Sequence, residues 1–374
     1  MVERGREDKK RLKTYKNLWD KFISDENIRL AIKNASKKKK KRNRVKEICE
    51  NEDKYIPIIR EYAINFVHFY HQPTEIYDGV SRKKRTIVIP TFMECILHHM
   101  VINVLKPMFT KGMYEHNCGS VPKRGGIHAK KYIQKWMRKG GKNIKYFFKM
   151  DIHHFYASIP QDKLIEKLKG KVHDRRFMRV LIEIIHSVPE GLPLGFYTSV
   201  WLGNWYLDEL DHMIKEKWGA VYYVRNVDDI VILGPSKKKL HKIRKATEEY
   251  LNTLSLRIKG DWQVARNIYS EGGRKRRGRV LDYIGYKFFR NRTTLRKSTL
   301  RKMRRKAINI WRKDKITSYD AKQMLSSLGW IKQSNIYNYY LRYIKPYVDF
   351  GKLKRIVSCA DKRKAGLYDR VCVG

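Results

Sequence analysis

The central part of the chain alternates between short apolar runs and apolar residues at helical spacing. A nearly continuous apolar run from Tyr146 to Met150 ends in Asp151 and predicts a buried strand. Two β-rich runs that flank a tight polar centre predict a hairpin over residues 221–234. The remaining pattern predicts a helix opening at Pro160, helices over 177–186, 202–214 and 236–254, and a strand over 283–289. This order is that of a split βαβ sheet with helices on one face.

The flanking regions are predicted to be mainly helical. Residues 1–48 are basic with apolar residues at helical spacing, and the chain from residue 295 onward is again basic and helical. We expect Pro57 to open one helix at its first position and Pro107 to end an apolar helix over 93–106. Between these helices, a basic turn leads into a strand that Pro90 stops.

The charge of the chain narrows the class of partner. Of 374 residues, 84 are Lys or Arg and 37 are Asp or Glu, which gives a formal net charge of +47. Such an excess repels itself without a polyanion nearby, so nucleic acid is the leading partner and an anionic membrane surface the weaker alternative. The longest charge-free stretch, residues 191–207, contains glycine, proline and polar groups and does not predict a membrane span. Five scattered cysteines without a Cys-x-x-Cys pair exclude a zinc ribbon and a disulfide framework, and fit a reducing cytosol.

Acidic residues stand out in so basic a chain. Asp151 ends an apolar strand, and Asp228 and Asp229 lie at the tip of an apolar hairpin. A carboxylate in such surroundings is costly unless it is paired or binds a metal. If the two strands are neighbours, these carboxylates converge, and such a group suits Mg²⁺ and two-metal phosphoryl transfer. The alternative is that Asp228 and Asp229 only form a polar turn.

Several segments, taken together and in order, resemble the motifs of prokaryotic reverse transcriptases over about residues 80–350. They are Lys84–Pro90 (fingers), Lys149–Ile159 and Gly191–Ser199 (palm), Arg225–Leu233 (catalytic hairpin), Asp282–Tyr286 (the strand motif before the thumb), and Leu295–Ser298 and Leu328–Ile331 (thumb landmarks). The chain most resembles the enzymes of diversity-generating retroelements and their phage and bacterial relatives. The Leu-Gly-x-x-x-Ser stretch at 194–199 and the expected lack of an appended maturase or endonuclease domain favour that subgroup.

The resemblance implies an α+β right-hand polymerase with a split βαβ (ferredoxin-like) palm, fingers and a helical thumb. The expected parts are a basic helical N-terminal extension (1–75), the fingers (76–145), the palm with the catalytic carboxylates (146–290) and a basic helical thumb and tail (291–374).

The resemblance also implies roles for the acidic positions. Asp151 and Asp228 would be catalytic and bind two Mg²⁺ ions, with Mn²⁺ as an alternative, and Asp229 would lie beside them. The backbone carbonyl of Ile152 would complete a metal shell.

A second implied set binds the incoming nucleotide. Tyr156 would exclude a ribose 2′-hydroxyl, and Arg85, with Lys84 or Lys83, would grip the triphosphate. The nucleotide and template pocket would be lined by Leu194, Gly195 and Ser199. Without the resemblance, these residues would be read as core packing, a solvated basic turn and a helix-entry turn.

Three positions depart from the family pattern. The family usually has Tyr at Asn226, Gln at Val200 and an Asp-Arg pair at Glu94-Cys95. Because the metal carboxylates are retained, we expect an active polymerase with altered nucleotide or primer handling. A degenerate enzyme is the alternative.

Two basic clusters are candidate nucleic-acid contacts, although such faces are often only solvated. They comprise Lys37, Lys38 and Lys39 near the N-terminus and Arg301, Lys302 and Arg305 in the thumb. The pairs His98-His99 and His153-His154 lack the spacing of a zinc site, and we expect surface histidines there.

Three functions follow as hypotheses. The leading one is a cytoplasmic RNA-directed DNA polymerase that makes cDNA from a retroelement RNA, with template RNA, RNA–DNA hybrid and dNTPs as partners. A structured noncoding RNA and an accessory protein are further expected partners, and no membrane is. The second hypothesis is an antiphage-defence enzyme that copies a small noncoding RNA or works without an ordinary template. The third is an inactive RNA-binding scaffold.

Overall fold

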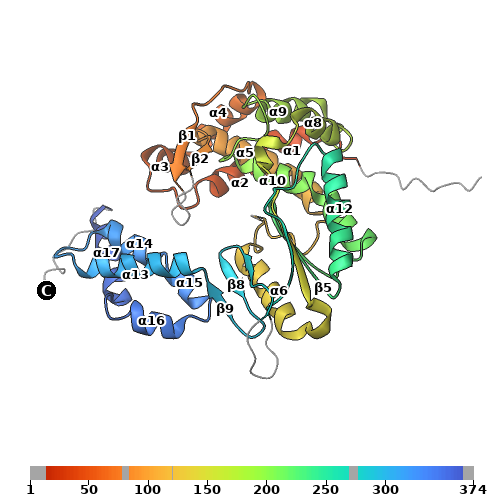
Figure 1. Cartoon of the computed structure of the whole chain (residues 1–374). Helices are drawn as coiled ribbons and strands as arrows, with labels where there is room; N and C mark the ends of the chain where they lie inside the picture. Colours follow the sequence, from red (N-terminus) through yellow and green to blue (C-terminus); the bar gives the residue numbers. More distant parts are fainter. Residues whose placement is uncertain (1–13, 78–83, 120, 269–276, 365–374) are drawn as a thin grey trace, which may run out of the picture. The chain divides into compact units, whose positions relative to one another are not determined.

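The computed structural model describes residues 14–77, 84–119, 121–268 and 277–364 (Figure 1). The chain divides into two compact units. The first unit contains residues 1–124, 149–230 and 241–262, and the second contains 125–148, 231–240 and 263–374. Within the described ranges, no helix has both the length and the apolar character to cross a membrane.

The first unit is mainly helical. Its helices are α1 (Trp19–Ile23), α2 (Asp25–Ala35), α3 (Asn43–Glu50), α4 (Glu52–Ile64), α5 (Phe92–Thr110), α7 (Phe155–Ser158), α8 (Gln161–Lys169), α9 (Arg175–Ile185), α10 (Tyr197–Tyr206), α11 (Asp208–His212) and most of α12 (Lys237–Thr253). The predicted helix over 202–214 is thus divided between α10 and α11, and a π-helical turn, Met213–Lys217, follows. Strands β1 (Thr74–Tyr77) and β2 (Lys84–Ile87) form an antiparallel pair.

Helix α5 is the centre of the N-terminal helices. A capping box starts it, in which the Thr91 hydroxyl accepts from the Glu94 amide at 3.2 Å and Glu94 accepts from the Thr91 amide at 2.7 Å. The side-chain amide of Asn27 in α2 donates to the backbone carbonyl of Met100 at 3.2 Å and so connects α2 to α5. Glu94 therefore has a structural role at one of the positions that depart from the family pattern.

Two proline predictions are wrong. Pro57 lies inside α4 and Pro107 inside α5, so neither begins nor ends a helix. A proline in a helix interior removes one hydrogen bond and clashes with the preceding turn. Both helices bury apolar residues before and after the proline, such as Ile56 and Ile59 in α4, and this packing outweighs the local preference.

The catalytic sheet has the strand order β4-β5-β3-β6. Its strands are β3 (Tyr146–Met150), β4 (Tyr222–Asn226), β5 (Asp229–Gly234) and β6 (Gln263–Arg266). The predicted strand and hairpin therefore both form, and β3 and β5 are neighbours. This neighbour relation is the one on which convergence of the carboxylates depends.

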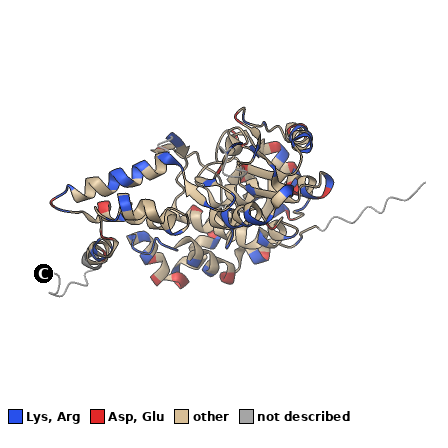
Figure 2. Ribbon diagram, turned by 60° about the horizontal axis from the view of Figure 1, so that its bottom comes forward, with Lys and Arg blue, Asp and Glu red and all other residues tan. Residues whose placement is uncertain are grey.

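The second unit contains a three-stranded antiparallel sheet and the C-terminal helices. The strands β7 (Leu281–Tyr283), β8 (Tyr286–Phe288) and β9 (Thr293–Leu295) lie in that order. The helices are α6 (Gly126–Lys139), α13 (Lys297–Trp311), α14 (Ser318–Leu325), α15 (Leu328–Lys332), α16 (Tyr337–Tyr343) and α17 (Phe350–Lys364), with a 3₁₀ turn at Gly141–Ile144. Lys and Arg are spread over many helices, including those of the C-terminal segment (Figure 2).

The single strand predicted over 283–289 is instead a hairpin. Ile284 and Gly285 have φ of +43° and +84°, and Tyr283 pairs with Tyr286 across this two-residue turn. A two-residue turn with both φ values positive matches the twist of the paired strands. A Cβ on Gly285 would lie 2.9 Å from the Trp330 ring, so the turn also fits closely against α15. The Ile-Gly sequence lacks the Asn or Asp that usually announces such a turn.

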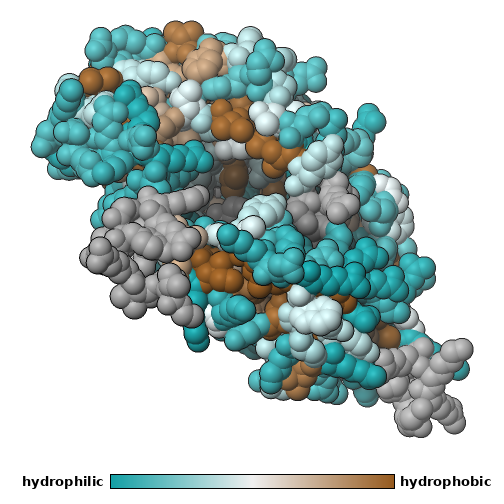
Figure 3. Space-filling model, turned by 90° about the vertical axis from the view of Figure 1, so that its left-hand side faces the viewer, coloured by the Kyte–Doolittle hydropathy of each residue, from teal (hydrophilic) through white to brown (hydrophobic). Residues whose placement is uncertain are grey.

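The outer surface is largely polar, as the composition requires. Figure 3 shows one face on which hydrophilic residues dominate and hydrophobic groups are separated between them. Isolated apolar side chains of this kind are normal on a protein surface.

Candidate active site

The candidate active site is built on the ends of two neighbouring strands. Asp151 directly follows β3, and Asp228 lies in the turn between β4 and β5. Burial raises the pKa of Asp228 to about 7, and the Asp151 carboxylate contributes through repulsion and a shared hydrogen bond. Two carboxyl groups this close cannot both ionise cheaply in a partly desolvated site. The fold therefore joins the two residues that the sequence singled out.

This carboxylate pair is incomplete by itself. The Oδ1 atom of Asp151 is buried and accepts no hydrogen bond within the described residues. Unsatisfied buried oxygen is costly unless a cation or donor reaches it. Asp229 begins β5, and no set of three or more His, Cys, Asp or Glu side chains suited to a metal occurs in the part of the chain described. Asp229 directly follows Asp228 in the chain.

The backbone beside Asp151 is fixed from the 257–259 segment. The Lys259 amide donates to the Asp151 carbonyl at 2.8 Å, and the His153 amide donates to the Arg257 carbonyl at 2.9 Å. The two bonds flank an antiparallel bridge between Ile152 and Ile258. The Ile152 carbonyl takes no part in either bond.

Lys259 is a site residue that sequence reasoning missed. Its pKa is raised mainly by a hydrogen bond to Asp261, and also by the charges of Asp151 and Asp228. Lys259 is thus within electrostatic reach of both carboxylates. Nothing in the local sequence distinguishes it from the chain's many other lysines.

A buried charged network holds the catalytic turn. The Arg225 side chain in β4 is fully buried and forms a bidentate pair with Asp211 of α11, at 2.7 and 2.5 Å. The same guanidinium donates to the Val227 carbonyl at 3.0 Å and to the Asn204 side chain at 3.2 Å. The Tyr223 hydroxyl also donates to Asp211. Sequence analysis gave none of these residues a role.

The loop before α6 closes over the same turn. The Cys118 backbone amide donates to the Arg225 carbonyl at 2.7 Å, and the Asn204 side-chain amide donates to the Gly119 carbonyl at 2.5 Å. A Cβ on Gly119 would lie only 2.6 Å from the Val227 amide nitrogen. Glycine is therefore required there by the close approach of two backbones.

Tyr156 and the glycine turn 191–195 lie together. The Leu192 amide donates to the Tyr156 carbonyl at 2.8 Å, and burial together with Asp228 raises the pKa of Tyr156 to about 12. At the other end of the turn, the Val88 amide donates to the Leu194 carbonyl at 2.7 Å. Gly195 has φ +117°, and a Cβ there would lie 2.1 Å from the Val88 carbonyl oxygen. Ser199 is buried in α10.

The two described basic residues of the fingers motif point in different directions. Arg85 is close enough to Asp228 for its charge to lower the pKa of that carboxyl. Lys84 instead forms a salt bridge with Glu75 of β1 at 2.6 Å. Successive side chains of a strand face opposite sides, so β2 presents only one of the two toward the carboxylates. Lys83 lies outside the described residues.

The remaining candidates lie on basic surfaces. Lys37 and Lys38 are exposed between α2 and α3, while Lys39 donates to the Cys95 thiol at 3.6 Å. Arg301 and Arg305 are exposed on α13, and Lys302 is half-buried there. Nothing in the structure tests their proposed contact with nucleic acid.

The histidine prediction is half wrong. His153 and His154 are exposed, but His98 is buried in α5 against Phe196, with ring centroids 4.5 Å apart. Burial lowers the pKa of His98 to about 3, so this ring is neutral. The apolar residues on every side of α5 placed it in the core.

Comparison with known proteins defines the class. The sequence profile of the family described as reverse transcriptase (RNA-dependent DNA polymerase) matches residues 76–262, half of the chain. The chain therefore belongs to this family. The mixed helix and sheet fold of the right-hand polymerase class, expected from the sequence, is confirmed with it.

Particular relatives agree with that class. Over 161 residues the chain is 26% identical to the group II intron-encoded protein LtrA of Lactococcus lactis subsp. cremoris, covering 40% of this chain and 26% of that protein. It is 20% identical over 147 residues to protein YkfC of Escherichia coli (strain K12), covering 36% of this chain and 39% of that protein. The resemblance to group II intron-like prokaryotic reverse transcriptases is thus confirmed, and the narrower subgroup stays a prediction. The chain spans well under half the length of these relatives.

One solved structure can be compared with the whole chain. The telomerase of Candida albicans, in complex with a fragment of telomeric RNA, aligns with a TM-score of 0.45 at 10% identity, covering 85% of this chain and 66% of that one. A likeness at that score carries no argument about this chain.

Proposed function

We propose that this protein is an RNA-directed DNA polymerase that extends a DNA 3′ end with dNTPs along an RNA template. The observation that carries the proposal is the Asp151–Asp228 pair, with the pKa of Asp228 raised, inside the segment that matches the reverse transcriptase family. A carboxyl pair of this kind is costly to a fold and is typical of catalytic sites.

The pair fits divalent metal ions. Asp151, Asp228 and the Ile152 carbonyl would hold Mg²⁺, with Mn²⁺ as an alternative, because all three are hard oxygen ligands. The buried Oδ1 of Asp151 lacks a hydrogen-bond partner in the described chain, and the pKa of Asp228 is raised, so both groups favour a cation between them. Two bound ions would supply activation of the attacking 3′-hydroxyl and neutralise charge on the leaving phosphates.

The chain's own side chains would bind and orient the nucleotide. Arg85 would pair with its phosphates, since the cationic side chain lies within electrostatic reach of Asp228. Tyr156 would pack against the sugar, and the turn at Leu194 and Gly195 would support the base. These positions are held relative to one another by the backbone bonds to Leu192 and Val88.

The source of the template is a finer part of the proposal. We propose a retroelement RNA in the cytoplasm, with a structured noncoding RNA or an accessory protein covering part of the +47 charge. A template–variable repeat pair beside the gene would support this source. A small noncoding RNA gene within a phage-defence locus would point instead to the defence enzyme.

The test is primer extension by the purified chain. A labelled DNA primer on an RNA template is incubated with Mg²⁺ and each dNTP in turn, beside Asp228→Ala. Template-directed extension that the variant lacks is expected. RNA binding that ignores both Mg²⁺ and the Asp228 substitution, without any extension, would support the scaffold instead.

A further inference from the structure

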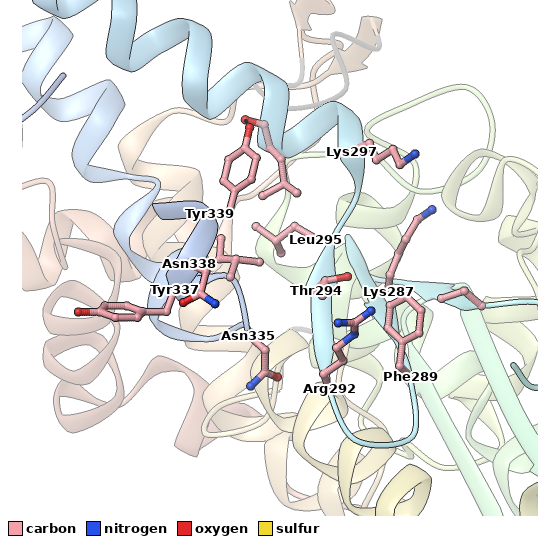
Figure 4. A pocket seen from close by; sticks show the side chains of 13 residues that line it. Lys287, Phe289, Arg292, Thr294, Leu295, Lys297, Asn335, Tyr337, Asn338 and Tyr339 are labelled. Carbon is pink, nitrogen blue, oxygen red and sulfur yellow. Dashed lines mark hydrogen bonds between the residues drawn. The ribbon is translucent and has the colours of Figure 1, made fainter. Parts of the chain in front are cut away.

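A groove of about 530 Å³ lies in the second unit, and none of the candidate catalytic, metal-binding, nucleotide-binding or nucleic-acid-binding residues lines it. Its walls come from β8, β9, the first turn of α13 and the start of α16 (Figure 4). Figure 4 shows Phe289, Arg292 and Thr294 on one side and Asn335, Tyr337 and Asn338 on the other. The volume is in the range of pockets that hold small organic groups, about 300–1,000 Å³.

The charge of this groove has one sign. It is lined by three basic side chains, Lys287, Arg292 and Lys297, and by no carboxylate. Within the described residues, none of these three side chains forms a salt bridge. Two other grooves of similar size are lined by both acidic and basic side chains. The acidic residues are Asp314 and Asp349 in one groove, and Asp174 and Glu183 in the other. Of these three grooves, this one alone has basic side chains without a carboxylate, and it therefore suits an anion.

The groove also offers planar groups. The Arg292 guanidinium lies over the Phe289 ring, 5.0 Å from its centroid, which makes a combined flat surface. The Tyr337 side chain opposite is 65% exposed. Below them, the Tyr339 hydroxyl donates to the Leu300 carbonyl at 3.1 Å and so fixes the floor. A surface of this kind stacks on a base.

Polar groups lie beside those rings. The side-chain carbonyl oxygen of Asn335 accepts a hydrogen bond from the Thr293 backbone amide at 2.9 Å, which orients the Asn335 side chain at the edge of the groove. Its amide nitrogen is then the group that can donate to a ligand. Asn338 adds a second amide, and amides of this type pair with the edges of bases.

We propose that this groove binds one unpaired nucleotide of a nucleic-acid strand. The base would stack against the Phe289–Arg292 surface or Tyr337, and its phosphates would meet Lys287 and Lys297. Bases in a duplex are already stacked on each other, so an aromatic groove favours an unpaired position. The inference rests on the proposed function only in taking nucleic acid as the ligand.

The experiment measures binding by the full chain without dNTPs. Fluorescently labelled oligouridine RNA, oligothymidine DNA and a blunt hairpin duplex are titrated with wild type, Arg292→Gln and Tyr337→Ala. Matched controls are Arg312→Gln and Tyr319→Ala, which change an exposed Arg and a 71% exposed Tyr outside the groove.

Tyr337→Ala should weaken binding of a single strand roughly tenfold, as expected for loss of one stacked base. Arg292→Gln should also weaken single-strand binding, because the flat surface that Arg292 forms with Phe289 is lost. The duplex and the control variants should change little, and the larger loss, for RNA or for DNA, identifies the strand bound. The proposal would be overturned if the variants lost affinity equally for single strand and duplex, or lost none. It would also be overturned if only an acidic peptide released the labelled oligonucleotide.

Discussion

The buried Arg225 guanidinium donates a hydrogen bond to the carbonyl of Val227, 3.0 Å away and one residue before the catalytic Asp228. Val227 has φ +63°, which is unfavourable for a β-branched residue. Such strain persists only where surrounding contacts hold it. Here Arg225 supplies the contact, and its own position is fixed by the charge of Asp211.

Replacing Arg225 should therefore affect both stability and catalysis. Arg225→Gln leaves the Asp211 charge buried without its partner, which typically costs about 3–5 kcal/mol. The double variant Arg225→Gln/Asp211→Asn removes both charges and should recover much of that loss. Unfolding in denaturant measures both variants.

Activity separates positioning by Arg225 from its contribution to stability. The double variant lacks the bond to the Val227 carbonyl. Its rate of primer extension should therefore stay about a hundredfold below that of wild type, and it should need more Mg²⁺. Recovery of full activity together with stability would show that Arg225 does not position the turn.

Gly119 gives an independent test of the same turn. Gly119→Ala places a methyl group 2.6 Å from the Val227 amide nitrogen, so the loop or the turn must shift. We expect a marked loss of extension with a smaller loss of stability. Gly329→Ala is the control, because nothing lies within 4 Å of its Cβ position. Equal activity of the two alanine variants would contradict the close fit.

The carboxylate pair predicts a pH-dependent stability. The pKa of Asp228 is raised from 3.8 to about 7, so the folded chain binds this proton more tightly than the unfolded chain. Without metal, stability should fall as pH rises between these values. Asp228→Asn should then stabilise the protein above pH 7 by at most about 4 kcal/mol, since the pKa of Asp228 is raised by about three units and one unit is about 1.4 kcal/mol.

Mg²⁺ should stabilise wild type and the Asp228→Asn variant to different extents. It should raise the melting temperature of wild type above neutral pH, because it binds the folded pair, and raise that of Asp228→Asn much less. Thermal melts across pH with and without Mg²⁺ measure both effects. A variant that gains no stability at high pH would show that the pair is not strained.

Arg85 and Lys84 form a matched pair of substitutions. Arg85→Gln should raise the KM for dNTPs about tenfold or more, because one charge-assisted contact to phosphate is lost. Lys84→Gln should change KM little, since Lys84 pairs with Glu75. Steady-state extension at varied dNTP concentration decides the point, and an equal effect of both substitutions would contradict the assignment.

The pairing of Asp151 with Asp228 could be predicted, because Asp151 ends an apolar strand and Asp228 lies at the tip of an apolar hairpin. The supports of that pair could not be predicted. Arg225 and Asp211 are far from unusual in a chain with so many charges, and only the packing of α11 on β4 joins them. The opposite directions of Lys84 and Arg85 follow from strand alternation, once the strand is known.

Errors in the fold have similar causes. Pro57 and Pro107 are tolerated because tertiary packing outweighs local propensity. The β7–β8 turn is closed by Ile284 and Gly285, a pair without the usual turn signal.

Single-nucleotide extension tests the central claim most directly. Wild type, Asp151→Asn and Asp228→Asn are given the same RNA template, DNA primer and Mg²⁺, and primer binding is measured alongside. The account predicts that wild type adds the templated dNMP, and that each variant binds the primed template normally yet adds none. Extension by either variant at the wild-type rate would contradict it.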